Sequence, residues 1–128
     1  MKYLTAEQVL FIHSRLIDET GGSHGIRDTS LLLFAIERPK SGFGDTELYP
    51  DIFAKSAALM ESLIKNHPFI DGNKRTAITS SAIFLQVNGH NLKVSQEEFE
   101  RFTLKMAVEK VSLEDTAKWF REHTKYGS

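Results

Sequence analysis

The chain has 128 residues, 41% of them hydrophobic and 26% charged, which predicts a single globular domain over residues 1–128. Its formal net charge of -1 provides no basic field for wholesale nucleic-acid binding, so we expect no direct nucleic-acid partner. The lack of cysteine excludes disulfides, a thiol nucleophile and a cysteine-ligated zinc site. We find no apolar signal region and no stretch long enough for a membrane, and we therefore expect a cytoplasmic protein without a membrane partner.

The first predicted element is a helix near the N-terminus. Thr5 and Gln8 form a capping-box pair, apolar residues then recur at helical spacing, and Gly21-Gly22 ends the pattern. His13 lies on the apolar stripe of this helix, so we expect it to be buried or half-buried rather than catalytic. No other histidine has a partner at metal-ligand spacing, which argues against a histidine metal site.

A second helix and a polar connection follow. Asp28 is a suitable N-cap for a helix over residues 29–37, and Pro39 ends it. Residues 40–50 then contain two glycines, a proline and two aromatic residues, Phe43 and Tyr49, that we expect to be exposed. Residue types alone leave open whether this segment is a plain surface connection or a flap beside a functional site.

Two long helices are predicted in the middle of the chain. The first covers residues 51–66. The second begins at about Asn73 and ends at Asn88-Gly89, and from Thr76 to Val87 it carries no charged residue. We therefore expect this helix to be buried nearly all round, at the centre of the domain.

Two further helices complete the predicted fold. Ser95 with Glu98, and Ser112 with Asp115, are capping boxes or close relatives, and each pair opens a helix with an apolar face. No stretch outside residues 40–50 has a convincing strand pattern. The sequence therefore predicts an all-α fold, a compact bundle of about six helices with a flap segment between the second and third helices.

The charge at the start of the central helix is unusual. Lys74 and Arg75 stand where exposed backbone N–H groups and the helix dipole disfavour cations. A bound anion would offset the repulsion between these cations and the positive end of the helix, and phosphate is the usual anion at a helix N-terminus. On this interpretation, removing either charge should not destabilise the protein in the absence of nucleotide.

Two side chains in the preceding loop add the other parts of a phosphate-transfer site. Asp71 could hold Mg²⁺, because this ion usually takes one or two carboxylates together with substrate phosphates. His67 can accept a proton near neutral pH. A base, a metal carboxylate and a phosphate cradle within nine residues suggest phosphoryl or nucleotidyl transfer.

Each of these residues also has a purely structural interpretation. Gly72 can supply a positive φ, Asn73 can cap the helix, Asp71 can pair with a neighbouring cation, and His67 can bond a backbone carbonyl. Phe69 packs the loop onto the core on either interpretation. The structural interpretation is favoured for each residue taken alone, but it leaves two cations at a helix start together with a histidine and a carboxylate unexplained. Both interpretations remain open on the residues alone.

The stretch from His67 to Arg75 resembles the signature of the Fic/Doc family, His-Pro-Phe-x-(Asp/Glu)-Gly-Asn-x-Arg. Fic adenylyltransferases usually carry Gly in place of Lys74 and a second Arg in place of Ile78. Lys followed by Arg-Thr-Ala is typical of the death-on-curing (Doc) branch. Four flanking stretches are also similar to Doc-type proteins: Gly21-Gly22, Gly25-Ile26-Arg27-Asp28, Arg38-Pro39 and Leu48-Tyr49-Pro50.

The resemblance implies a toxin of a type II toxin–antitoxin pair that transfers the γ-phosphate of ATP to a hydroxyl of a protein target. The expected target is elongation factor Tu, and the expected result is arrest of translation. It also implies that residues 40–50 are a flap beside the active site that guides the target. The implied catalytic residues are His67 as base, Asp71 with Mg²⁺, Lys74 and Arg75. The implied nucleotide-binding residues are Phe69, Gly72, Asn73, Lys74 and Arg75.

Two alternatives remain at this point. The first is a Fic-type transfer of AMP, in which the α-phosphate is attacked, and spacing alone does not separate it from phosphate transfer. The second is a non-catalytic nucleotide- or nucleic-acid-binding module, against which the intact His67, Asp71, Asn73 and Arg75 argue.

Control of the activity is expected to come from another chain. Some Fic proteins carry an inhibitory Ser/Thr-x-x-x-Glu-Gly/Asn motif, whereas no Glu in this sequence is followed by Gly or Asn. We therefore expect a cognate antitoxin, a short and acidic protein that folds on binding near the flap and the Arg75 end of the site.

Overall fold

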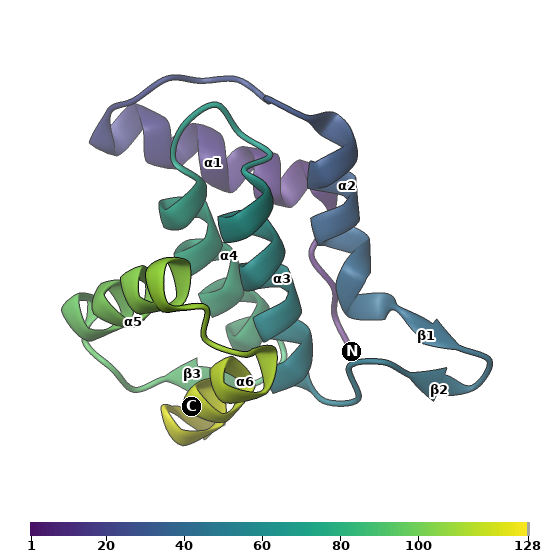
Figure 1. The fold of residues 1–128 in the computed structure, drawn as a ribbon. Coiled ribbons are helices and arrows are strands. Elements are labelled where there is room, and N and C mark those ends of the chain that lie inside the picture. Colours follow the sequence, from purple (N-terminus) through teal and green to yellow (C-terminus); the bar gives the residue numbers. More distant parts are fainter. Residues whose placement is uncertain (128) are drawn as a thin grey trace.

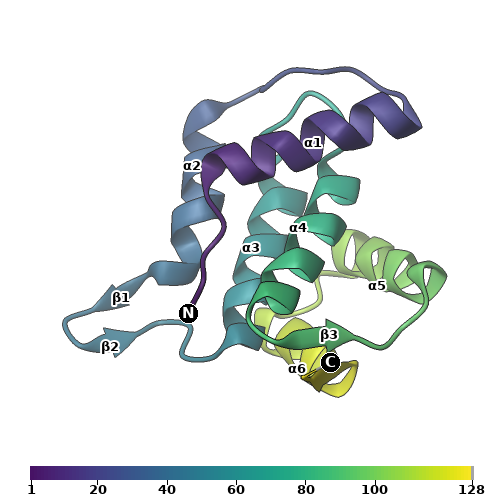
Figure 2. The same ribbon diagram turned by 180° about the vertical axis from the view of Figure 1, so that it is seen from behind.

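Two antiparallel helices form the centre of the structure, a computed structural model that describes residues 1–127. They are α3 (Ile52–Asn66) and α4 (Asn73–Val87), and every other helix packs against one of them (Figures 1 and 2). The remaining helical elements are α1 (Ala6–Thr20), α2 (Thr29–Glu37), the 3₁₀ turn η1 (Arg38–Lys40), α5 (Gln96–Glu109) and α6 (Leu113–Glu122). The prediction of a bundle of about six helices is confirmed.

Side-chain caps fix the starts of five of the six helices in the described residues. The Thr5 hydroxyl accepts a hydrogen bond from the Gln8 N–H at 3.2 Å, and the Gln8 side chain accepts one from the Thr5 N–H at 2.8 Å, as the capping-box pattern predicts. The other four caps accept the N–H of the third helical residue in the same way, and they are Asp28, Asp51, Ser95 and Ser112. Helix α4 alone begins without such a cap.

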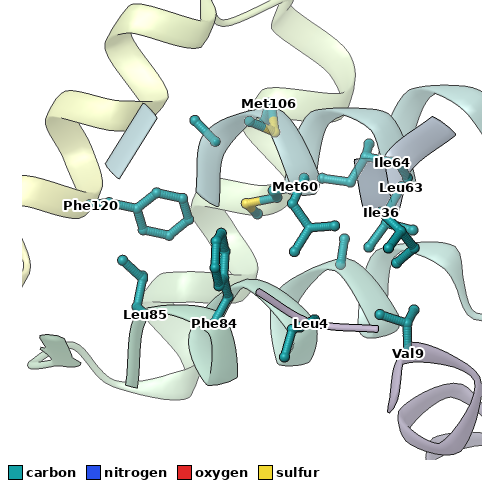
Figure 3. Packing of buried hydrophobic residues seen from close by; sticks show 14 of the residues in the cluster. Leu4, Val9, Ile36, Met60, Leu63, Ile64, Phe84, Leu85, Met106 and Phe120 are labelled. Atoms are coloured by element: carbon teal, nitrogen blue, oxygen red, sulfur yellow. The ribbon is translucent and has the colours of Figure 1, made fainter. Parts of the chain in front are cut away.

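The hydrophobic core lies between α3, α4 and the helices around them. Met60 of α3 lies beside Phe84 of α4, Leu63 packs further along α3, and Met106 and Phe120 close the core from α5 and α6 (Figure 3). All five side chains are at most 1% exposed. None of the helices in residues 1–127 combines the length and the apolar content that crossing a membrane requires.

The expectation that the central helix is buried nearly all round is only partly correct. Ile78, Ala82 and Ile83 are partly buried against the core, and Val87 is 41% exposed. Figure 2 shows the reason, because α1 crosses one end of α4 and leaves the rest of that side uncovered.

The prediction that no strand lies outside residues 40–50 is wrong. β3 (His90–Leu92) follows α4 and pairs antiparallel with β4 (Thr124–Tyr126), with His90 opposite Tyr126. Each strand has three residues, too few for an alternating pattern to show in the sequence.

Residues 40–50 contain a short hairpin, and its position differs from the expectation. β1 (Gly42–Phe43) pairs with β2 (Thr46–Glu47) between α2 and α3, as the prediction of a flap segment there requires. The hairpin extends from the start of α3, however, whereas the His67 loop lies at the other end of that helix (Figure 1). A helix of 15 residues is roughly 22 Å long, so the hairpin is not beside the loop. The expectation of a flap adjoining the site is therefore wrong for this segment.

The two aromatic residues of this segment differ in exposure. Phe43 is 91% exposed, as predicted, whereas Tyr49 is 9% exposed, which corrects the expectation. The hydroxyl of the buried Tyr49 is satisfied, because it accepts a hydrogen bond from Arg38 Nε at 2.8 Å, and Arg38 also pairs with Glu61 of α3 at 2.9 Å. This contact joins the end of the hairpin segment to the central helix.

A buried lysine anchors the hairpin itself. Lys55 of α3 is 1% exposed, and its Nζ donates to Glu47 Oε1 at 2.8 Å and to the Pro39 carbonyl at 3.1 Å. A buried cation needs such partners, because desolvation disfavours the charged form. Glu47 therefore holds β2 against α3.

We predict that Glu47→Ala lowers the free energy of unfolding by about 1–3 kcal/mol, because it removes a hydrogen bond to a buried charge. Glu97→Ala is the matched control, since Glu97 pairs with Arg101 at 3.3 Å on the exposed side of α5, and its loss should cost at most about 0.5 kcal/mol. Urea denaturation of both variants provides the comparison. Equal losses would show that Lys55 does not depend on Glu47.

Candidate active site

The loop between α3 and α4 opens onto a pocket at one end of the bundle. The pocket has a volume of about 410 Å³ and is lined by His67, Ile70, Asp71, Gly72, Asn73, Lys74 and Arg75. Six of the seven residues that the sequence analysis assigned to the site therefore line one cavity. A second cavity of about 440 Å³, between α1 and α4, is lined mainly by apolar side chains and contains none of them.

The N-terminus of α4 faces this pocket without a cap. Gly72 precedes the helix with a left-handed backbone, at a φ of 77°, as its structural interpretation predicts. The N–H groups of the first turn have no acceptor within the helix, and no side chain in the described residues caps them. Lys74 projects from this turn and is exposed. The first-turn N–H groups and the Lys74 ammonium are not paired with an anion of the described chain. This helix end is therefore suitable for binding a phosphate.

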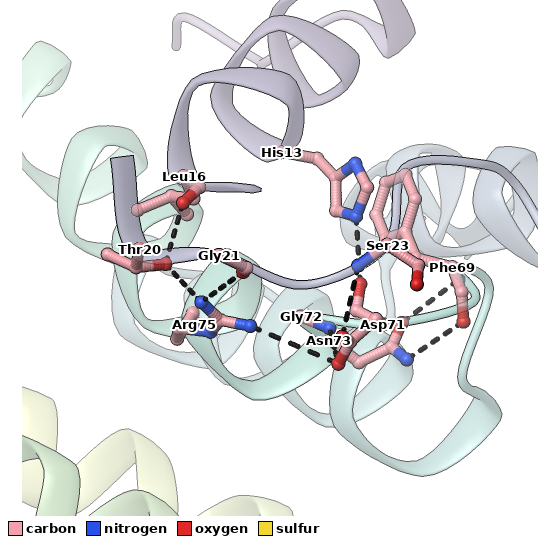
Figure 4. A network of polar contacts seen from close by, with 10 residues as sticks. All are labelled: His13, Leu16, Thr20, Gly21, Ser23, Phe69, Asp71, Gly72, Asn73 and Arg75. Atoms are coloured by element: carbon pink, nitrogen blue, oxygen red, sulfur yellow. Dashed lines mark hydrogen bonds and ion pairs between the residues drawn. The ribbon is translucent and has the colours of Figure 1, made fainter. Parts of the chain in front are cut away.

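Asp71 is the carboxylate of the pocket, and backbone N–H groups hold both of its oxygens. Ser23 donates to Oδ2 at 3.2 Å and Gly72 donates to Oδ1 at 2.8 Å (Figure 4). These two bonds, the one from Ser23 first, lower the pKa of the Asp71 carboxyl from its ordinary value, and Arg75 and His13 act in the same direction. Asp71 is therefore an oriented anion at neutral pH.

Gly22 allows the α1–α2 connection to approach Asp71 this closely. Its φ is +115°, and a Cβ added there would lie 2.6 Å from Asp71 Oδ2. The sequence analysis identified Gly21-Gly22 as the end of a helix and as a stretch similar to Doc-type proteins, without a contact to Asp71. The contact of this segment with the carboxylate is a long-range feature that no local pattern indicates.

Asp71 fits Mg²⁺ only together with a ligand that supplies further oxygens. It is the one carboxylate among the residues that line the pocket, and residues 1–127 contain no group of three or more side chains that could hold a metal alone. Each carboxylate oxygen accepts one N–H and keeps a lone pair. This arrangement matches a magnesium ion that is bound through one carboxylate and nucleotide phosphates.

Arg75 has partners that the sequence analysis did not foresee. Its guanidinium donates to the Thr20 hydroxyl and, at 3.1 Å, to the Gly21 carbonyl, and it lies 3.9 Å from Asp71 Oδ1 (Figure 4). The pairing of Asp71 with a neighbouring cation is thus present as the structural interpretation proposed. Arg75 also binds the end of α1 through these hydrogen bonds. We therefore revise the expectation that removing the Arg75 charge leaves the stability of the fold unaffected.

Asn73 and Phe69 hold the loop closed from within. The Asn73 side chain accepts the Phe69 N–H and donates to the Phe69 carbonyl, both at 3.0 Å, so it does not cap α4. The Phe69 ring is 1% exposed and packs the loop onto the core, as predicted. This ring is absent from the pocket lining, so any nucleotide contact of Phe69 would come from its backbone.

His13 supports the loop from α1, a role that sequence reasoning missed. Its predicted burial is confirmed at 4% exposure. Its ring stacks on Phe69 with centroids 3.8 Å apart, and its Nε2 lies 2.8 Å from the Asp71 carbonyl, so this nitrogen carries a proton. The only signal in the sequence was its place on the apolar stripe of α1, which does not indicate a contact 58 residues away.

His67 stands at the edge of the pocket with an exposed side chain. It ends α3 in a left-handed conformation, with φ 49° and ψ 60°. No hydrogen bond joins its ring to any residue of the described chain. The structural interpretation, in which His67 bonds a backbone carbonyl, is therefore wrong. The ring is accessible to a ligand and could accept a proton from it.

We predict that Arg75→Ala and Lys74→Ala differ in their effect on the protein without nucleotide. Arg75→Ala should lower the free energy of unfolding by about 1 kcal/mol, because the hydrogen bonds to α1 are lost. Lys74→Ala should leave it unchanged or raise it by a few tenths of a kcal/mol, because Lys74 opposes the helix dipole. Thermal and urea denaturation measure the stability of both variants. Equal changes in their free energies of unfolding would contradict a structural role that Arg75 has and Lys74 lacks.

Comparison with known proteins agrees with these features. The Toxin Doc of Mycolicibacterium smegmatis (strain ATCC 700084 / mc(2)155) is 41% identical over 91 residues, which cover 71% of this chain and 68% of that protein. The Protein kinase doc of Escherichia phage P1 is 29% identical over 128 residues, which cover 100% of this chain and 98% of that protein. The sequence model of the Fic/DOC family matches residues 3–85, which include α1, the whole loop and most of α4. This chain belongs to the Fic/DOC family.

Proposed function

We propose that this protein is a Doc-type toxin that transfers the γ-phosphate of ATP to a hydroxyl of a protein target. The observation that carries the proposal is the pocket at the uncapped start of α4, where His67, Asp71 and Lys74 surround one space. The names of the two relatives, a toxin and a protein kinase, support the same activity.

Each residue has a distinct part in the proposed reaction. The first-turn N–H groups of α4 and Lys74 bind phosphate oxygens, and Arg75 adds positive charge beside them. Asp71 would hold Mg²⁺ on the phosphates, and the ion would neutralise charge that develops there. Asn73 and Phe69 keep the loop in the shape that this binding requires.

Proton transfer completes the reaction. His67 removes the proton of the target hydroxyl while the hydroxyl oxygen forms a bond to the γ-phosphorus. The bond from that phosphorus to the β–γ bridging oxygen breaks, and ADP leaves. The proton on His67 then passes to water. Catalysis rests on positioning and charge stabilisation more than on covalent chemistry.

Transfer of AMP is the second candidate, because the same groups could present the α-phosphate. Ile78 weighs against it, since the Fic pattern has a second arginine there. In this chain Ile78 packs against the core and provides no charge to the triphosphate. A non-catalytic binding module is the candidate of another class, and the unengaged His67 ring weighs against it.

We predict that a bacterial lysate incubated with the protein takes up label from γ-labelled ATP and not from α-labelled ATP. His67→Ala should lower the transfer by about 10²–10⁴-fold, the usual effect of losing a general base. His24→Ala is the control, because this exposed histidine pairs with Asp18 and does not line the pocket. Label from α-labelled ATP would indicate AMP transfer, and no label with nucleotide bound would indicate a binding module.

The biological role adds further proposals. We expect the target to be elongation factor Tu and the consequence to be arrest of translation, as in the family branch that the chain resembles. Expression without a partner should stop bacterial growth, and a folded His67→Ala protein should not. Mass spectrometry of the labelled lysate would identify the target.

We also predict an antitoxin encoded by a neighbouring gene, a short acidic protein that binds over the pocket. Lys74 is the exposed cation there, whereas Arg75 is partly engaged by Asp71 and α1. Because the β1–β2 hairpin lies at the other end of α3, we now place this partner at the pocket and not near the hairpin. Co-expression with the neighbouring reading frame should restore growth and yield a complex that Lys74→Ala weakens. Persisting toxicity with no complex would refute inhibition by that neighbour.

A further inference from the structure

The segment that joins α1 to α2 lies directly against the His67 loop. Ile26 forms an isolated antiparallel bridge with Phe69, and Ile70 donates to the Gly25 carbonyl at 3.1 Å. Within this segment Arg27 makes contacts that the reaction proposed above does not use. These contacts are hydrogen bonds to the backbone carbonyls of residues 66–68, at the end of α3.

Arg27 and its neighbour hold three consecutive carbonyls. The Arg27 side chain donates from Nη2 to the Asn66 carbonyl and from Nε to the His67 carbonyl, each at 2.6 Å. The backbone N–H groups of Arg27 and Asp28 donate to the Pro68 carbonyl at 2.7 and 3.0 Å. The last carbonyls of a helix lack partners within the helix, and a cation there also interacts favourably with the dipole.

This arrangement fixes the backbone of His67. The Asn66 carbonyl belongs to the peptide plane before His67, and the His67 carbonyl belongs to the plane after it. The φ and ψ angles of His67 are the two rotations between these planes. One planar guanidinium that binds both oxygens therefore sets both angles, and it does so at φ 49° and ψ 60°, which a residue other than glycine rarely adopts.

We propose that Arg27 is a positioning residue, which holds His67 in the orientation needed for proton transfer. This inference rests on the proposed role of His67 as the base. Arg27 is exposed, so water can replace its hydrogen bonds to the carbonyls when it is removed. Water would satisfy the oxygens without fixing their direction. The expected defect is thus in geometry and not in folding.

The kinetic test compares Arg27→Ala and Arg27→Lys with the wild-type protein. Arg27→Ala should lower kcat by about 10²-fold, the size of effect that misplacing a catalytic group by about 1 Å produces. KM for ATP should stay within about twofold, because the phosphate contacts come from α4. Arg27→Lys should retain an intermediate kcat, since an ammonium lacks the fork that spans two carbonyls. Guanidinium ion at millimolar concentration should partly restore Arg27→Ala.

Arg101→Ala is the matched control, because Arg101 is an exposed arginine that pairs with Glu97 on α5. Its kcat should equal that of the wild type. An unchanged kcat in Arg27→Ala would overturn the proposal. A fall in kcat that accompanies a large loss of thermal stability, with no rescue by guanidinium, would assign Arg27 a structural role and overturn it as well.

A spectroscopic measurement separates this inference from the proposed function. The Hε1–Cε1 NMR signal of His67, assigned by its loss in His67→Ala, should shift or broaden in Arg27→Ala and stay in place in Arg101→Ala. The distant His90 and His123 signals should not change in either variant. If the wild-type protein transferred no phosphate, the proposed function would fail while this measurement still tested the positioning of His67. An unchanged His67 signal in Arg27→Ala would overturn the proposal.

Discussion

The start of α4 differs from every other helix start in the described chain, because a glycine and not a capping side chain precedes it. A side-chain cap stabilises a helix by about 1 kcal/mol, and α4 lacks this contribution while carrying two cations in its first turn. Burial offsets the loss: Ala77, Phe84 and Leu85 are at most 1% exposed against the rest of the core. The bundle thus keeps in place a helix whose N-terminal N–H groups remain for a ligand.

The loop ahead of that helix is held by contacts from three directions. Asn73 braces it from α4, His13 supports it from α1, and Arg27 binds its first carbonyls from the α1–α2 connection. The groups that face the pocket are therefore set on a backbone that other elements fix. This agrees with the general requirement that reacting groups be held within a fraction of an ångström before the substrate arrives.

Most of the fold could be predicted because its signals are local. The caps at Thr5, Asp28, Ser95 and Ser112 lie within four residues of the groups they bond, so sequence reasoning found each helix start. The loop residues could be predicted for the same reason, since Asp71, Gly72 and Lys74 are neighbours in sequence as well as in space.

The missed features are contacts between distant segments. His13 meets Asp71 across 58 residues, and Arg27 meets His67 across 40. The same holds for the pairing of β3 with β4 and for the partners of Arg75 on α1. The misplaced flap has a different cause. A flap segment between the second and third helices was foreseen, but its distance from the loop depends on the direction in which α3 runs, which neither composition nor spacing specifies.

Because the hairpin lies far from the pocket, a group can be attached to the hairpin without blocking the pocket. Phe43 and Gly44 sit at the tip of the hairpin, and Gly44 has no neighbouring atom within 4 Å of an added Cβ. The rigid length of α3 lies between this tip and His67, so a bulky group attached at the tip leaves the pocket open. A fluorophore or an affinity handle placed there would follow the protein in cells and in complexes while the pocket at the opposite end stays accessible.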